Sequence, residues 1–142
     1  MTDLNTYLTK ELDYLAIDVS LPRGAVLFRD GDPVSAVYVI RKGAVNLEWF
    51  FQRTSFFQLL RRGEIAGLTA ALNGSYSLTA RAAIDCELGY IPTDRVLQLL
   101  DRNSHLCVMA MAQMTRELST IRSAALRCRF ESESDRGLRF IA

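Results

Sequence analysis

The stretch from Gly63 to Ala83, GEIAGLTAALNGSYSLTARAA, combines residue types that could bind a small anion. Its three glycines, Gly63, Gly67 and Gly74, permit tight turns in which backbone groups approach a ligand closely. A bound phosphate also needs a cation, and the planar fork of a guanidinium matches its oxygens. The first question is whether this stretch keeps the charges of such a site or only its turns.

Metal and cofactor chemistry finds little support in the residue types. The three cysteines, Cys86, Cys107 and Cys128, are odd in number, widely spaced and without a CxxC pair, which argues against a zinc site or an iron–sulfur cluster. His105 is the only histidine. We therefore expect no metal and no cofactor, and we expect buried thiols in a reducing compartment.

Composition bounds the class of protein. The chain has 142 residues, 49% of them hydrophobic and 23% charged, which is typical of one globular domain. Its apolar runs are far shorter than the roughly 18 residues that a membrane span requires, and its first residues do not resemble a signal peptide. We expect a cytoplasmic protein without a membrane partner. The formal net charge of +1 favours no general attraction to nucleic acid.

The pattern of turns and apolar runs predicts mainly β structure. Residues 3–15 carry leucines at helical spacing, which predicts a short amphipathic helix. Runs rich in Val, Ile and aromatic residues follow, separated by Gly, Pro and Asp, and these predict strands at 25–28, 36–41, 44–51, 54–60, 79–83 and 86–91. Many short strands at near-regular spacing indicate a small antiparallel barrel or jelly roll.

Two helices are predicted after the strands, a short one at 94–100 and a long one at about 104–128, capped by Asn103 or Ser104. Spacings of four and three define a heptad seam made of Cys107, Met111, Met114, Leu118, Ile121, Ala125 and Cys128. Such a seam favours a homodimer through this helix; a helix packed only on its own barrel is the alternative. A second apolar set, Leu106, Met109, Ala110 and Leu126, would face the barrel.

Several motifs in this order resemble the effector domain of the catabolite activator protein and the Crp/Fnr superfamily of transcription regulators. The motifs are LFRDGD at 27–32, VYVIRKGAV at 37–45, GEIAGL at 63–68, CEL at 86–88, Ile91-Pro92, and AQM at 112–114 with Leu118. The resemblance implies a double-stranded β-helix or jelly-roll barrel with flanking helices, similar to a cyclic nucleotide-binding domain, followed by a long C-terminal dimerisation helix.

The ligand-binding residues of that family are not all matched. Leu68 stands where the resemblance implies a ribose-binding Glu, and Tyr76-Ser77 stand where it implies the phosphate-binding Arg-Ser pair. On the long helix, Ile121 and Arg122 replace the small hydroxyl residues that would meet the base. Arg81 and Arg122 are the nearest cations that could rebuild an anion site. The candidate ligand-binding residues are therefore Gly67, Leu68, Tyr76, Ser77, Arg81, Ile121 and Arg122.

The resemblance implies a sensory domain at 1–129 and, at 130–142, a linker or the start of a DNA-binding domain. We expect a dimeric regulatory domain of a Crp/Fnr-type regulator, with an unknown small-molecule ligand and without cyclic nucleotide bound in the usual way. DNA would be a partner only if a helix-turn-helix domain follows residue 142. The alternative is a cyclic AMP or cyclic GMP receptor with a rearranged anion site. An enzyme is not expected, because one histidine cannot supply the metal triad of related β-helix enzymes.

Overall fold

The structure is a computed structural model, and it describes residues 4–51 and 53–115. Helix α1 (Leu4–Leu15) is followed by strands β1 (Ile17–Leu21), β2 (Val26–Phe28), β3 (Ala36–Lys42), β4 (Val45–Phe51), β5 (Thr54–Leu60) and β6 (Ile65–Ala66). Helix α2 (Leu68–Asn73), β7 (Thr79–Ala82), β8 (Cys86–Pro92) and α3 (Thr93–Arg102) complete the labelled elements. A last helix occupies residues 104–115.

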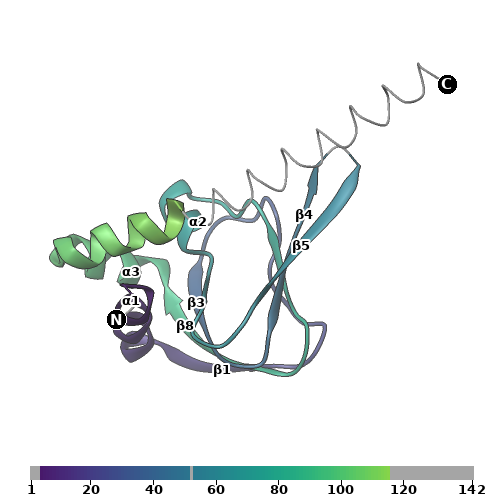
Figure 1. Cartoon of the computed structure of the whole chain (residues 1–142), viewed down its shortest axis with the longest axis horizontal. Coiled ribbons are helices and arrows are strands. Elements are labelled where there is room, and N and C mark those ends of the chain that lie inside the picture. The colour runs from purple at the N-terminus through teal and green to yellow at the C-terminus, as the bar shows by residue number, and fades with distance from the viewer. Residues whose placement is uncertain (1–3, 52, 116–142) are drawn as a thin grey trace, which may run out of the picture.

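The strands form two antiparallel sheets of four. One sheet has the order β1-β8-β3-β6 and the other β2-β7-β4-β5. Figure 1 shows the strands curving around a common interior, with α1, α3 and the last helix gathered at one end. The predicted jelly-roll class, mainly β with flanking helices, is confirmed in this part of the chain.

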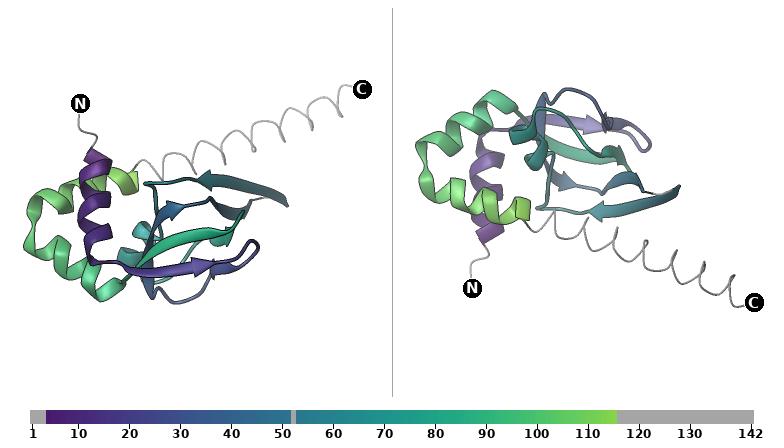
Figure 2. Two further views of the ribbon diagram at one scale, coloured as in Figure 1. Left: turned by 90° about the horizontal axis from the view of Figure 1, so that it is seen from below. Right: turned by 90° about the horizontal axis from the view of Figure 1, so that it is seen from above.

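Strand β3 separates two apolar cores because its side chains alternate between two faces. Val37 and Val39 belong to a helix-side core with Leu8 and Leu12 of α1 and residues of α3 and the last helix. Ala36, Tyr38 and Ile40 belong to a barrel core inside the two sheets. Figure 2 shows the corresponding division of the molecule into a helical end and a barrel.

Glycine is required at the turn between β3 and β4. Gly43 has a φ of 96°, and a Cβ there would lie 2.6 Å from the Asp85 carbonyl oxygen and 2.8 Å from the Cys86 sulfur. Both the left-handed conformation and the close approach exclude a larger residue. The Lys42-Gly43 break in the sequence therefore marks a turn packed directly against the start of β8.

The sequence predicted most elements but missed three. Strand β1 was missed because Ile17, Asp18 and Ser20 are exposed on an edge strand and give only a weak alternation. Strand β6 has only two residues, and α2 has only six, between glycines that by themselves indicate turns. Asn103 caps the last helix as expected, since its side-chain oxygen accepts hydrogen bonds from the N–H groups of His105 (3.1 Å) and Leu106 (3.2 Å).

Candidate functional site

The glycine-rich stretch folds as a turn, a short helix and a second turn. Gly67 precedes α2 and Gly74 follows it, both in the left-handed conformation, with φ values of 88° and 89°. A Cβ at Gly67 would lie 3.3 Å from both the Ala36 carbonyl oxygen and the Tyr76 ring. The chain therefore packs closely against Gly67 on the side where a side chain would start.

Tyr76 fills the position at which the resemblance implies a phosphate-binding arginine. Its side chain is 3% exposed and stacks on Phe28, with ring centroids 3.9 Å apart and planes within 8°. Its hydroxyl donates to the Ala36 carbonyl oxygen (2.7 Å) and accepts from the N–H groups of Ala36 (3.1 Å) and Ser35 (3.3 Å). The one donor and both acceptor sites of the hydroxyl are therefore used in hydrogen bonds to residues at the start of β3, and none is left for a ligand.

Leu68 does not face the same region as Tyr76. It is 1% exposed and packs in the helix-side core, whereas Tyr76 belongs to the barrel core. The two candidate residues are close in sequence, but the structure directs them into different cores. They do not together line one ligand site.

Ser77 and Arg81 do not meet inside the barrel either. Ser77 is exposed. Arg81 alternates with Ala80 and Ala82, whose side chains lie in the barrel core, so Arg81 lies on the outer face of β7. There it pairs with Glu48 (Nε to Oε1, 3.5 Å) and donates to the Gly24 carbonyl oxygen (3.4 Å). In this arrangement Arg81 does not point into the barrel core, and its predicted part in an anion site stays a prediction.

The barrel core holds further phenols near Tyr76. Tyr38 pairs with Tyr90 across β3 and β8 and contacts it edge to face, with ring centroids 5.6 Å apart. Burial raises the pKa of Tyr38 to about 12, and the neighbouring Tyr76 and Tyr90 add to the increase.

The remaining predicted site residues are only partly described. Ile121, Arg122, Leu118, Ala125 and Cys128 lie outside the described residues, so their predicted roles stay predictions. Of the three seam residues that are described, Met111 is exposed, Cys107 is half-buried and Met114 is buried in the helix-side core. The exposed apolar residues of this helix are Val108 and Met111, so exposure falls on Val108 and not on its neighbour Cys107, which was the predicted seam residue.

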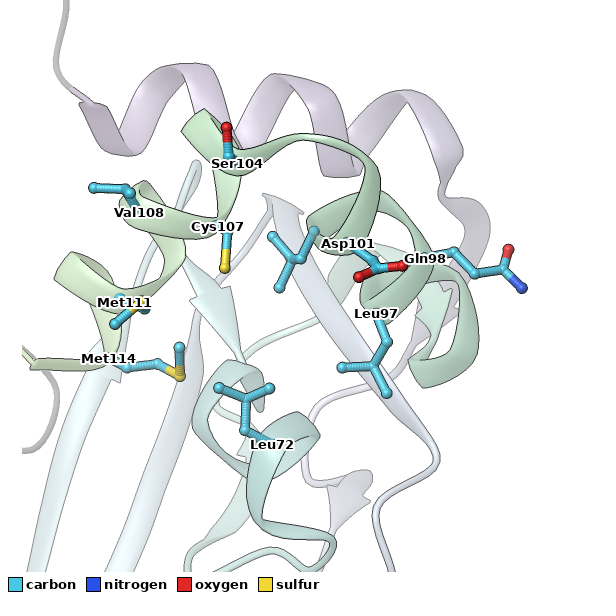
Figure 3. A pocket seen from close by; sticks show the side chains of 10 residues that line it. Leu72, Leu97, Gln98, Asp101, Ser104, Cys107, Val108, Met111 and Met114 are labelled. Atoms are coloured by element: carbon cyan, nitrogen blue, oxygen red, sulfur yellow. The ribbon is translucent and has the colours of Figure 1, made fainter.

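Sequence reasoning missed a groove on the helical end of the molecule, which we call the helix groove. It has a volume of about 760 Å³ and lies between α2, α3 and the last helix. Its apolar lining consists of Leu72, Leu97, Leu100, Cys107, Val108, Met111 and Met114. Its polar lining consists of Gln98, Asp101 and Ser104. Figure 3 shows these side chains around the groove. The available signal in the sequence was Val108, an apolar residue that belongs to neither of the two apolar sets predicted for the helix at 104–128.

The described residues hold neither a candidate metal cluster nor a helix that could span a membrane. Across residues 4–51 and 53–115, no group of three or more His, Cys, Asp or Glu side chains could hold a metal ion. In the same residues no helix is long and apolar enough to cross a membrane. The described cysteines, Cys86 and Cys107, are free thiols.

Comparisons with known proteins agree with this fold. The family model for the cyclic nucleotide-binding domain matches residues 18–103, more than half of the chain. A comparison with curated protein sequences finds no match. Among solved structures, the Thermus thermophilus catabolite activator protein aligns with a TM-score of 0.71 and 26% identity, over 89% of this chain and 59% of its own.

Two other solved structures extend the comparison at the level of fold. The c-di-GMP responsive global regulator CLP of Xanthomonas campestris aligns with a TM-score of 0.69 and 20% identity, over 88% of this chain and 62% of its own. The EAL enzyme Bd1971 in a cGMP-bound form aligns with a TM-score of 0.62 and 24% identity, over 78% of this chain and 30% of its own. The resemblance recognised in the sequence is confirmed, and the chain belongs to the cyclic nucleotide-binding domain family.

Proposed function

We propose that this chain is a dimeric sensory domain of a Crp/Fnr-type transcription regulator whose barrel does not bind cyclic nucleotide in the usual way. The main support for this proposal is the state of Tyr76, which is buried, stacked on Phe28 and hydrogen-bonded to the backbone. It stands at the position where the resemblance implies a cation that binds the phosphate. An unpaired phosphodiester charge in such surroundings costs several kcal/mol. Similarity to transcription regulators such as the catabolite activator protein supports the regulatory class rather than an enzyme.

Calorimetry with cyclic AMP and cyclic GMP tests the absence of ordinary nucleotide binding. We expect no saturable heat at concentrations up to the millimolar range. Binding in the micromolar range would contradict the proposal. If such binding were weakened by Arg81→Ala or Arg122→Ala, the alternative of a receptor with a relocated cation would replace it. Lys10→Ala, an exposed position on α1, is the matched control for loss of a surface cation.

The dimer is proposed from the heptad pattern of the long helix. The positions that we expect to contact the partner helix are Leu118, Ile121, Ala125 and Cys128, together with Met111, which is exposed on the described part of the helix. Leu118→Glu or Ile121→Glu would place like charges across a two-fold seam. We expect sedimentation to report a dimer for the parent chain and for Ile84→Glu, an exposed position on the β7–β8 turn, and a monomer for the two seam variants.

The DNA partner is proposed only for a longer protein. A helix-turn-helix domain after residue 142 would let the dimer read two half-sites, because two-fold symmetric proteins bind two-fold symmetric operators. For the chain of 142 residues we expect no sequence-dependent shift of a DNA duplex at physiological salt. A nanomolar, sequence-dependent shift would contradict this part of the proposal.

A further inference from the structure

We propose that Asn73 is a site of spontaneous deamidation and that its isoaspartate product loosens the turn that holds Tyr76. This is a covalent modification site at the end of α2, and the reaction needs neither an enzyme nor a bound ligand. The inference goes beyond the proposed sensory function and does not depend on it.

Asn73 is the asparagine whose neighbour along the chain best permits the reaction. The chain has four asparagines, Asn5, Asn46, Asn73 and Asn103, which are followed by Thr, Leu, Gly and Ser. A Cβ on the following residue hinders the approach of its backbone nitrogen to the side-chain carbonyl carbon, and only glycine has none. Asn73-Gly74 is therefore the pair at which a five-membered ring closes most readily.

The reaction exchanges an amide for a carboxylate without an oxidant or a reductant. The Gly74 nitrogen loses its proton and attacks Cγ of Asn73, a C–N bond forms, and the side-chain nitrogen leaves as ammonia with that proton. Water then opens the resulting succinimide. Attack at Cγ gives aspartate, whereas attack at the backbone carbonyl carbon of residue 73 gives isoaspartate, in which the main chain runs through the side-chain methylene.

The folded chain presents Asn73 to solvent. Its side chain is exposed and makes no hydrogen bond within the part of the chain that the structure describes. A Cβ built on Gly74 would meet no atom of the described residues within 4 Å, so the space beside it is open to water. The Gly74 N–H is nevertheless engaged, because it donates to the Ala70 carbonyl oxygen (2.9 Å). The reaction therefore requires this hydrogen bond to open.

The end of α2 opens readily because the helix is short. It has only six residues, and Gly74 follows it in the left-handed conformation, with a φ of 89°. A helix of this length is not stable by its own hydrogen bonds, and helix ends open locally far more often than a whole domain unfolds. Local opening frees the Gly74 nitrogen while the barrel stays folded, so the modification proceeds in the native protein.

The segment after α2 carries the effect of the product to Tyr76. The Gly74 carbonyl oxygen accepts a hydrogen bond from the Val34 N–H (2.9 Å). Tyr76 donates its N–H to the Asp32 carbonyl oxygen (3.0 Å), and its own carbonyl oxygen accepts from the Gly31 N–H (2.8 Å). An extra methylene in the main chain just before Gly74 displaces this segment relative to the loop before β3. These hydrogen bonds then weaken, and Tyr76 is held less firmly.

Peptide mapping by mass spectrometry tests the modification itself. Trypsin cleaves after lysine and arginine, so each asparagine lies on a different peptide, and Asn73 lies on residues 63–81. The folded chain is incubated in mildly alkaline buffer, and replacement of NH by O is followed on all four peptides. We expect residues 63–81 to be modified at least about tenfold faster than the other three peptides, since only Asn73 precedes a glycine.

Two controls accompany the mapping. Asn73→Gln should abolish the modification of residues 63–81, because a ring of six members closes far more slowly. Asn103 is the internal control, since a small residue follows it and its side-chain oxygen is held by the N–H groups of His105 and Leu106. We expect its peptide to stay unmodified while residues 63–81 react.

Hydrogen exchange tests the effect on Tyr76. Ion-exchange chromatography isolates the modified chain by its added negative charge, and an isoaspartyl methyltransferase quantifies the isoaspartate in it. Asn73→Asp is the matched control, because it carries the same charge on an ordinary main chain. We expect the N–H groups of Gly31, Val34 and Tyr76 to exchange at least about tenfold faster in the isoaspartate form than in Asn73→Asp, and the N–H groups of β8 to exchange alike in both.

Two results would overturn the proposal. Modification of residues 63–81 no faster than that of the peptide with Asn103 would show that Asn73 is not a modification site of the folded chain. Equal exchange of the three N–H groups in the isoaspartate form and in Asn73→Asp would show that the product leaves Tyr76 in place. Both measurements are separate from the cyclic nucleotide calorimetry, so failure here leaves the proposed function standing.

Discussion

The barrel interior and the helix groove differ in the room that they leave for a ligand. In the barrel, aromatic rings and small alanines fill the space, and Tyr76 uses its hydroxyl to hold the start of β3. In the groove, apolar side chains of the same protein remain exposed around an open volume of about 760 Å³. The region that resembles a binding site in sequence is therefore closed, and the region with room for a ligand has no recognisable motif.

This difference has a physical origin in hydrogen bonding and packing. A filled interior gains stability from every methylene that it buries. An open groove gives up that stability, and a fold tolerates it most easily on its surface, where the surrounding helices can still pack on their other faces. Substitutions should consequently cost much in the barrel and little in the groove.

The largest effect is expected at Tyr76. Tyr76→Ala removes the ring that stacks on Phe28 and leaves a cavity, and we expect a loss of about 3–5 kcal/mol in the free energy of unfolding. Tyr76→Phe keeps the ring and removes only the hydroxyl that serves Ala36 and Ser35, so about 1–3 kcal/mol should be lost. Urea unfolding measures both. Equal stability of Tyr76→Phe and the parent chain would show that these hydrogen bonds contribute little.

A pair of neighbours on the last helix compares the core with the groove directly. Leu106 is fully buried in the helix-side core, and Val108, two residues later, is exposed in the groove. Leu106→Ala should lose about 2–5 kcal/mol of unfolding free energy, whereas Val108→Ala should change it by no more than about 0.5 kcal/mol. Chemical denaturation of the two variants checks the contrast. A large loss at Val108 would mean that the groove is already covered in solution.

The closed interior should also appear in an alkaline titration. The pKa of Tyr38 is about 12 in the folded chain, above the ordinary 10.0, chiefly because its neutral form is favoured by burial. The unfolded chain loses this proton first as the pH rises, so the stability contributed below pH 10 should decline between pH 10 and about 12. Ultraviolet absorbance of tyrosinate follows the titration, and Tyr38→Phe should abolish this component. A Tyr38 that titrates like an exposed phenol would contradict a closed interior.

The smallest effect is expected on the outer face of the barrel. The side chains of Arg81 and Glu48 are 42% and 34% exposed, and Arg81 Nε lies 3.5 Å from Glu48 Oε1. Arg81→Ala should therefore lower the unfolding free energy by less than about 1 kcal/mol. Arg41→Ala should lower the unfolding free energy by more. Arg41 of β3 donates hydrogen bonds to both the carboxylate and the backbone carbonyl oxygen of Asp13 in α1, and so ties the helix to the strand. Thermal unfolding in low and high salt compares the two.

Most of the barrel could be predicted from local sequence. Strands β3, β4, β5, β7 and β8 are rich in β-branched, aromatic or small apolar residues and are bounded by turn residues, so pattern alone placed them within a residue or two. Strand β1 could not be placed, because an exposed edge strand loses the alternation on which such reasoning depends. The helix cap at Asn103 was predictable because a capping side chain acts within three residues.

The ordered motifs of the sequence were enough to indicate the fold family, and the resemblance implies that Leu68 and Tyr76 stand where that family has a carboxylate and a guanidinium. Only the tertiary structure decided that Tyr76 turns into the barrel core while Leu68 turns into the helix-side core, and that Arg81 lies on the outer face. It also brought Leu72, Leu97 and Met111, from three separate elements, around one groove. Local patterns encode strands, caps and turns, but the direction of a side chain and the meeting of distant elements depend on contacts that no short stretch of sequence contains.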